Sequence, residues 1–160
     1  MPHRPRRNTT NYLGGEVCSI ARALENVGER WTLLIIREAF RDCTKFADFR
    51  TRLDIAPNIL STRLNSLVGA GIFEERRYEE RPVRHEYLLT DKGRDLYPVL
   101  ISLMAWGDRW AAGDDGPPLT LMHGRHRARP HLVCGHCDAE IDSHNTSTRV
   151  GPGLLALTST

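Results

Sequence analysis

Residues 57–71, PNILSTRLNSLVGAG, constrain the fold of this chain more than any other stretch. Pro57 suits the first turn of a helix, and Gly69 and Gly71 suit its end. On a wheel of about 100° per residue, apolar side chains share one sector and short polar side chains fill the opposite one. The apolar set is Leu60, Leu64, Leu67 and Val68, and the polar set is Asn58, Ser61, Thr62, Asn65 and Ser66. The pattern predicts a helix with one face on a core and one face outward.

The outward face of this helix lacks the Glu and Lys residues that exposed helices usually carry. Short amide and hydroxyl groups let a helix approach the floor of the DNA major groove, where Asn pairs with adenine and Ser or Thr serves several base edges. The side chains expected to face bases are Asn58, Ser61, Thr62 and Asn65. Arg63, on the flank, is expected near the DNA backbone. A polar face that is only solvated is the alternative that this pattern leaves open.

Three shorter helices are expected before this one. Apolar residues recur at helical spacing in residues 18–40, CSIARALENVGERWTLLIIREAF, with a break at Gly28 that divides the stretch into two helices. The stretch KFADFRTRLD, residues 45–54, repeats the helical pattern over a short span. A turn at DIAPN, residues 54–58, then leads into the helix that begins at Pro57.

Residues 72–89 predict a two-stranded hairpin. Ile72 and Phe73 are matched by the apolar residues 87–89 across a polar centre that contains proline, and the turn is expected near residues 80–83. The acids and arginines near the root are expected to pair across the strands. At the tip, Arg81 and Arg84 are expected to reach a phosphate or the minor groove. A short helix, a turn, a second helix and a hairpin follow the order of a winged helix-turn-helix.

A long helix is expected after the hairpin, over residues 91–112, with Thr90 as its cap and Pro98 as a bend. Leucines form one apolar stripe on this helix, and Val99, Trp106 and Trp110 lie beside it. Twenty-two residues at about 1.5 Å each give about 33 Å, which is too long for so small a domain to cover. We therefore expect a second subunit to cover it.

From Cys18 to Trp110 the chain resembles the HxlR-type family of bacterial winged-helix transcription regulators. The stretches that carry the resemblance are CSIARALENVGERWTLLIIREAF, KFADFRTRL, ILSTRLNSLVGAGI, HEYLLTDKGRDLYPVL and WGDRW. The resemblance implies a mainly α fold with a small β-hairpin, of α+β class, and a homodimer formed through terminal helices. It implies binding to an inverted-repeat operator in double-stranded DNA. We expect a sequence-specific regulator, a repressor, that is not an enzyme and needs no cofactor to bind DNA.

Two cysteines lie in the part of the chain that carries the resemblance. Cys18 begins the first helix, where unpaired backbone N–H groups favour a thiolate. A thiolate there suits a sensor of oxidants or electrophiles, and the resemblance implies such a use; a small buried hydrophobe is the alternative. Cys43 follows the second helix with no nearby His, and we expect a core or loop thiol.

The stretch CGHC, Cys134 to Cys137, equals the active-site motif of thiol-disulfide isomerases. Such an enzyme needs this motif near the start of a sheet-and-helix domain, and only 23 residues follow Cys137, so we reject that activity. His123 and His126 form a second pair with ligand spacing, and the two pairs together could close a tetrahedral, zinc-ribbon-like site. His131, His136 and His144 are competing donors. A disordered tail or a reversible disulfide is the alternative to structural zinc.

Three parts are expected along the chain: a flexible basic arm over residues 1–15, a DNA-binding and dimerisation domain over 16–112, and a linker with a metal-binding tail over 113–160. No apolar run approaches the roughly 18 residues of a membrane span, and the basic start lacks an apolar segment behind it. We expect a cytoplasmic bacterial protein, bound to the nucleoid, with no membrane partner. The competing hypothesis is a redox- or zinc-dependent protein-interaction module that uses Cys134 and Cys137.

Overall fold

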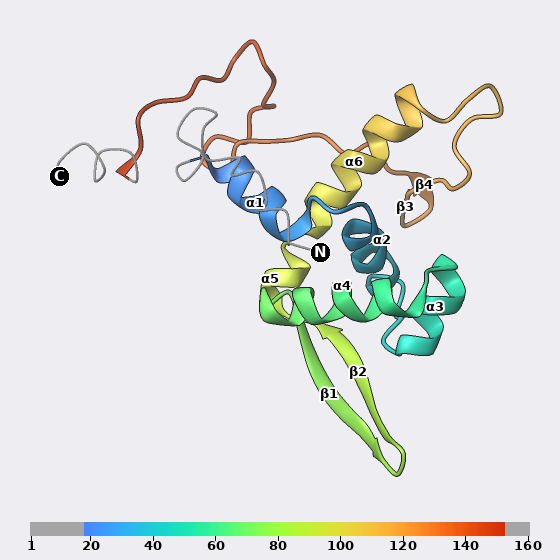
Figure 1. Cartoon of the computed structure of the whole chain (residues 1–160). Helices are drawn as coiled ribbons and strands as arrows, with labels where there is room; N and C mark the ends of the chain where they lie inside the picture. Colours follow the sequence, from blue (N-terminus) through green and yellow to red (C-terminus); the bar gives the residue numbers. More distant parts are fainter. Residues whose placement is uncertain (1–17, 153–160) are drawn as a thin grey trace, which may run out of the picture. The chain divides into compact units, whose positions relative to one another are not determined.

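The computed structural model describes residues 18–152, which form helices and two small antiparallel sheets (Figure 1). The helices are α1 Ser19–Val27, α2 Arg30–Ala39, α3 Phe46–Leu53, α4 Pro57–Gly69, α5 Asp91–Arg94 and α6 Tyr97–Trp110. The strands are β1 Phe73–Glu80, β2 Val83–Leu89, β3 Met122–His123 and β4 His126–Arg127. The expected α+β class and winged helix-turn-helix are confirmed. The N-terminal arm lies outside the described residues.

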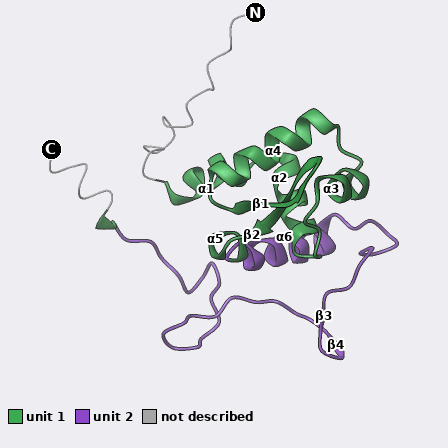
Figure 2. Cartoon of the chain, turned by 90° about the horizontal axis from the view of Figure 1, so that it is seen from below, with its two compact units in different colours: residues 1–94, 150–160 green, residues 95–149 purple. Residues whose placement is uncertain are grey.

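The chain divides into two compact units, which Figure 2 shows in different colours. One unit comprises residues 1–94 with 150–160, and the other comprises residues 95–149. The division that the sequence suggested, after residue 112, stays a prediction. Helices α1 to α5 and the hairpin of β1 and β2 thus belong to the first unit, whereas α6 and the segment after it belong to the second.

The core of the first unit lies where α2, α3, α4 and the root of the hairpin meet. Its fully buried side chains are Ile35, Ile36, Cys43, Phe49, Leu60, Leu64, Leu67, Ile72 and Phe73. The rings of Phe49 in α3 and Phe73 in β1 lie 6.3 Å apart between centroids. Burial of this set fixes α4 against α3 and sets the direction in which the hairpin leaves the core.

A buried carboxylate joins α2 to α3. The Glu38 side chain is 5% exposed and accepts ion pairs from Arg37 at 2.7 Å, Arg41 at 3.3 Å and Arg52 at 3.5 Å. Arg52 lies in α3, whereas Glu38 and Arg37 lie in α2. A buried carboxylate needs such partners, because removing a charge from water without a partner strongly destabilises the folded state. The cluster therefore sets the spacing of the two helices that support α4.

The hairpin follows α4 directly, through Gly71 in the left-handed region at φ 67°. Its strands pair antiparallel from Phe73 opposite Leu89 to Glu80 opposite Val83, with a bulge at Tyr78. These pairs confirm the predicted hairpin and its turn at residues 80–83. Figure 1 shows the two strands extending away from α4 within the first unit.

The region after the hairpin differs from the expected single bent helix over residues 91–112. The Gly93 N–H donates to the Thr90 hydroxyl at 3.1 Å, which confirms the cap. Helix α5 nevertheless ends at Arg94, and α6 begins at Tyr97 with Pro98 in its first turn. A proline is tolerated in a first turn, where its missing N–H has no helical partner, so the chain starts a new helix there.

Candidate nucleic-acid interface

Helix α4 presents the two faces that its sequence predicts. Leu60, Leu64 and Leu67 are at most 1% exposed and pack into the core. The predicted polar set, Asn58, Ser61, Thr62, Asn65 and Ser66, is exposed throughout. The first turn carries no acidic residue, so the positive end of the helix dipole is not neutralised from within. The face thus offers short polar groups to an anionic partner, with no acidic residue in α4 itself.

Hydrogen bonds inside α4 divide its polar side chains into two groups. The Thr62 hydroxyl donates to the Asn58 carbonyl at 2.8 Å, and the Ser66 hydroxyl donates to the Thr62 carbonyl at 2.9 Å. These hydroxyls keep their lone pairs as outward acceptors. Among residues 18–152, the amides of Asn58 and Asn65 make no side-chain hydrogen bond that would occupy them. They present a donor and an acceptor together, which is what bidentate contact with adenine needs.

Arg63 lies differently from its neighbours on α4. Its guanidinium is 4.0 Å from the Glu29 carboxylate at the start of α2, and its side chain is 24% exposed. This position borders a hollow lined by α1, the start of α2 and α4. Arg63 therefore points toward the supporting helices in this structure, and its expected contact with the DNA backbone stays a prediction.

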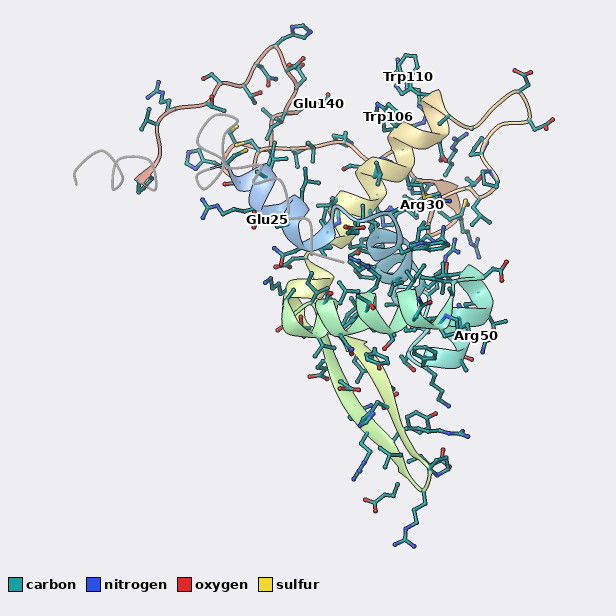
Figure 3. The ribbon with its side chains drawn as sticks, in the orientation of Figure 1. Glu25, Arg30, Arg50, Trp106, Trp110 and Glu140 are labelled. Carbon is teal, nitrogen blue, oxygen red and sulfur yellow. The ribbon has the colours of Figure 1, made fainter. Side chains whose placement is uncertain are left out.

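The last turn of α3, next to the turn that leads into α4, contains a basic residue, Arg50, that was not predicted. Asp54 ends α3 in the left-handed region at φ 47°, and Ile55 is buried beneath the turn. Arg50 lines an open hollow of about 730 Å³ together with Pro57, the first residue of α4. A guanidinium beside the free N–H groups of a helix start suits a phosphate. Mapping the basic residues of α3 onto the helix would have identified Arg50, which Figure 3 labels.

Charges along the hairpin separate by position. Near the root, Arg76 pairs with Glu86 at 2.8 Å, which confirms the predicted cross-strand pairing. Near the tip, Arg84 pairs with Glu79 at 3.3 Å, so part of its charge is satisfied within the hairpin. Arg81 occupies the turn, is exposed, and has no ion pair among residues 18–152. Of the two predicted tip arginines, Arg81 is the one with its charge uncompensated.

A third extended segment supports the hairpin and was not predicted. The Tyr87 N–H donates to the Thr44 carbonyl at 2.8 Å, and Lys45 forms an antiparallel bridge with Glu86. The Lys45 ammonium lies 4.9 Å from the centre of the Tyr78 ring, at the bulge in β1. These contacts tie the hairpin to the segment before α3, which gives the hairpin a fixed direction relative to α4.

The structure separates the two front cysteines by environment. Cys18 is half-buried at the N-cap of α1, where its carbonyl accepts the Arg22 N–H at 3.0 Å. Cys43 is 1% exposed, and burial raises the pKa of its thiol to about 11. The core interpretation of Cys43 is thereby confirmed. Cys18 lies at the helix start as expected, and its sensing role stays a prediction.

The four predicted zinc ligands do not form one site in the described part of the chain. Strands β3 and β4 bring His123 and His126 together, with ring centroids 5.3 Å apart. Cys134 and Cys137 occupy a separate turn, in which backbone N–H groups of His136 and Cys137 lower the pKa of Cys134. Across residues 18–152, no three His, Cys, Asp or Glu side chains gather at metal-binding distances. The donor set is divided, so structural zinc stays a prediction.

Within residues 18–152, no helix combines the length and the apolar character that crossing a membrane requires.

Comparison with protein families and relatives places this geometry among known regulators. A family model described as HxlR-like helix-turn-helix matches residues 26–115. The uncharacterized HTH-type transcriptional regulator Rv3095 of Mycobacterium tuberculosis is 47% identical over 141 residues, which cover 86% of this chain and 89% of the relative. The uncharacterized HTH-type transcriptional regulator YvaP of Bacillus subtilis is 32% identical and covers 59% of this chain and 90% of its own.

Solved structures of transcription regulators also superpose on this chain. PA1607, a candidate transcription factor, superposes with a TM-score of 0.74 at 33% identity and covers 84% of this chain and 94% of its own. The reduced form of the redox regulator HypR superposes with a TM-score of 0.53 at 26% identity, and the match covers 57% of this chain and 92% of HypR. The reduced form of the transcriptional regulator YodB from B. subtilis superposes with a TM-score of 0.51 at 31% identity, and the match covers 59% of this chain and 94% of YodB.

Proposed function

The chain belongs to the HxlR-like helix-turn-helix family, and from that premise we propose that it reads a specific operator through the outward face of α4. It is a transcriptional regulator of the winged-helix type. The observation that carries the proposal is the exposed, acid-free polar face of α4, on which the amides of Asn58 and Asn65 lie seven residues apart. Two helical turns, about 10.5 Å, separate these amides, so they can contact bases about three base pairs apart in one major groove.

Around this helix, charged groups are arranged to hold the DNA backbone. Arg50 lies beside the first turn of α4, and Arg81 lies at the hairpin tip. Contacts to phosphates fix register and orientation and carry no sequence information themselves. In this proposal α4 contacts the bases, and Arg50 and Arg81 contact phosphates and position the protein. Arg84 is paired with Glu79 and would contact a phosphate only after DNA displaces that carboxylate.

The operator is proposed to be an inverted repeat bound by a homodimer, which acts as a repressor. Support for the dimer comes from α6, none of whose residues is buried and whose Val99, Leu103, Trp106 and Trp110 are between 50% and 65% exposed. A two-fold dimer matches a palindromic site because each protomer reads one half. A bacterial cytoplasmic location follows from this function.

A thiol switch at Cys18 is the second part of the proposal. Cys18 lies at the start of α1 and is half-buried, so a small oxidant reaches it, whereas Cys43 is sealed in the core. HypR, which shares this fold at 26% identity, is named a redox regulator. Oxidation or alkylation of Cys18 would change the first helix and thereby weaken operator binding.

Selection of bound fragments from the source genome by purified protein tests these proposals. The wild type should enrich one inverted-repeat sequence, and the Asn58→Ala, Asn65→Ala double variant should lose that preference. Each bidentate contact discriminates by about 1–3 kcal/mol, so the ratio of specific to nonspecific binding should fall at least about tenfold. Asn26→Ala is the matched control, because the Asn26 amide donates to the Arg22 carbonyl within α1 and is not part of the outward face of α4. An unchanged preference in the double variant would contradict the assignment of α4.

The same selection repeated with diamide tests the switch. Oxidised wild-type protein should release the enriched fragments, and a Cys18→Ser variant should retain them. If diamide releases the DNA fragments equally from both proteins, Cys18 is not the sensor. The competing hypothesis, a protein-interaction module that depends on Cys134 and Cys137, predicts no sequence enrichment under either condition.

A further inference from the structure

The second unit contains a cavity that the proposed function does not use. It has a volume of about 410 Å³ and lies between α6 and the segment that includes the β3–β4 hairpin. Its lining includes the apolar Ile101, Met104, Ala105 and Leu121 and the arginines Arg127 and Arg129, all within residues 95–149. Small-molecule sites typically measure about 300–1,000 Å³. We propose that this cavity binds a small carboxylate with an aromatic or aliphatic body.

Apolar side chains form one wall of the cavity. Ile101, Met104 and Ala105 follow one another at helical spacing on α6, and Leu121 faces them from the opposite segment. These four residues are half-buried, so part of their apolar surface is still in contact with water. A ligand with an apolar body would remove that surface from water and bind through the hydrophobic effect.

Positive charge dominates the rim of the cavity. Arg109, Arg127 and Arg129 line it against the single carboxylate of Asp108. Among residues 18–152, none of the three arginines makes an ion pair, although the Arg109 guanidinium lies 4.7 Å from the centre of the Trp110 ring. A carboxylate matches the planar fork of a guanidinium and forms paired, charge-assisted hydrogen bonds with it. An anion is therefore favoured over a neutral or cationic ligand of the same shape.

The β3–β4 hairpin brings two of the arginines to the same side of the chain. The Ala128 N–H donates to the Leu121 carbonyl at 2.8 Å, which closes the base of the β3–β4 hairpin. Residues 127 and 129 flank this bond in an extended segment, where alternate side chains project to the same side. The hairpin backbone therefore places both arginines on one side of the segment, at the cavity that they line.

The cavity occupies its own face of α6. At about 100° per residue, Ile101, Met104 and Ala105 centre on the side opposite Leu103 and Trp106. A ligand in the cavity would thus leave the exposed apolar side of α6 accessible to a partner. The inference needs only the second unit, so it stands or fails independently of DNA binding by the first.

Binding of 1-naphthaleneacetate to the full chain, measured by isothermal titration calorimetry, tests this inference. The comparison ligand is 1-naphthaleneacetamide, which has nearly the same shape and no charge. We expect saturable binding of the carboxylate at one site per chain and at least about tenfold weaker binding of the amide. The Arg127→Gln, Arg129→Gln double variant should lose at least about tenfold in affinity for the carboxylate and little for the amide. Arg125→Gln, at the hairpin turn and outside the cavity, is the matched control and should bind as wild type.

Three results would overturn the inference: no saturable binding, equal affinity for acid and amide, or unchanged affinity in the double arginine variant. An Ala105→Phe variant gives an independent test, because the added ring fills the apolar part of the cavity. It should abolish binding of both ligands while circular dichroism shows wild-type helix content. Retained binding in that variant would place the ligand elsewhere and overturn the site.

Discussion

At the scale of single residues, Cys43 shows how burial controls the chemistry of a side chain. It is 1% exposed between α2 and α3, and burial raises the pKa of its thiol from 9.0 to about 11, an effect that Arg52 partly offsets. The buried thiolate is disfavoured because it would lose its hydration without gaining an equivalent partner. Cys43 is therefore a packing residue, and thiol chemistry belongs to the accessible cysteines.

The raised pKa of Cys43 predicts a loss of stability at alkaline pH. Because the folded pKa exceeds the unfolded one, this contribution is fully present below pH 9 and is lost as the pH rises toward 11. A shift of about two units corresponds to about 2–3 kcal/mol. Urea unfolding between pH 8 and 10.5 should show a smaller decline for Cys43→Ala than for wild type, although the variant starts less stable. Ser143→Ala, an exposed and non-titrating substitution in the tail, should decline as wild type does. A parallel decline in Cys43→Ala would contradict the prediction.

At the scale of elements, the hairpin explains how an acidic stretch can serve an anionic partner. Some of its carboxylates are paired within the ribbon, Glu86 with Arg76 and Glu79 with Arg84. The Glu75 carboxylate lies 3.3 Å from the His85 ring and accepts the Tyr87 hydroxyl at 3.5 Å. Net charge over the stretch is thus a poor guide to the charge at its tip, where Arg81 stands without an ion pair among the described residues.

Replacement of Arg81 by alanine should weaken DNA binding regardless of sequence. One lost phosphate contact per protomer lowers the slope of log affinity against log salt by about 0.9 for each protomer bound. Fluorescence anisotropy of an operator fragment over a range of salt concentrations measures the slope. Arg76→Ala, which removes a paired arginine at the root, is the control and should leave the slope nearly unchanged. An unaltered slope for Arg81→Ala would remove the hairpin tip from the interface.

The sequence predicted those elements whose signals are local. Apolar spacing was enough to assign the inner and outer faces of α4, and matched apolar ends were enough to assign the hairpin. Pro98 was ambiguous, since proline is compatible both with a bend and with a first turn, and only the structure separates α5 from α6. The bridge from Lys45 to Glu86 joins residues far apart in the chain, which no local pattern indicates.

Part of the candidate interface could not be predicted from the sequence, because it also depends on contacts between residues far apart in the chain. Wheel geometry placed Arg63 on the flank of α4, but its neighbour Glu29 belongs to another helix, so the direction of its side chain could not be foreseen. Arg50 is a candidate phosphate contact because the turn between α3 and α4 brings it beside Pro57. The zinc ligands show the converse case, since their spacing suggested one site and the described structure keeps the two pairs apart.

At the scale of the whole molecule, α6 links the proposed dimer to the proposed ligand. The helix has 14 residues, about 21 Å at 1.5 Å each, and so is shorter than the 33 Å that first suggested a second subunit. Its exposed apolar stripe, Val99, Leu103, Trp106 and Trp110, supports the dimer independently of that length. The four residues recur at spacings of four, three and four, as in helix pairs that pack along a seam. Figure 3 shows Trp106 and Trp110 standing out from the helix.

Introducing charge into this stripe should convert the dimer to a monomer. In a two-fold interface each substitution occurs twice, and burying a Leu or Trp side chain stabilises by about 1.5–3 kcal/mol. Leu103→Glu with Trp106→Glu should therefore weaken dimerisation more than about a hundredfold, measured by sedimentation velocity over a concentration series. The control is Thr120→Glu with Ser143→Glu, which adds the same charge at exposed sites outside α6. The charged stripe variant should still bind 1-naphthaleneacetate, because the cavity lies on the opposite face of the helix. It should bind the two halves of the full repeat independently, without the cooperativity of the dimer. A dimer that persists with wild-type affinity would show that another surface joins the protomers.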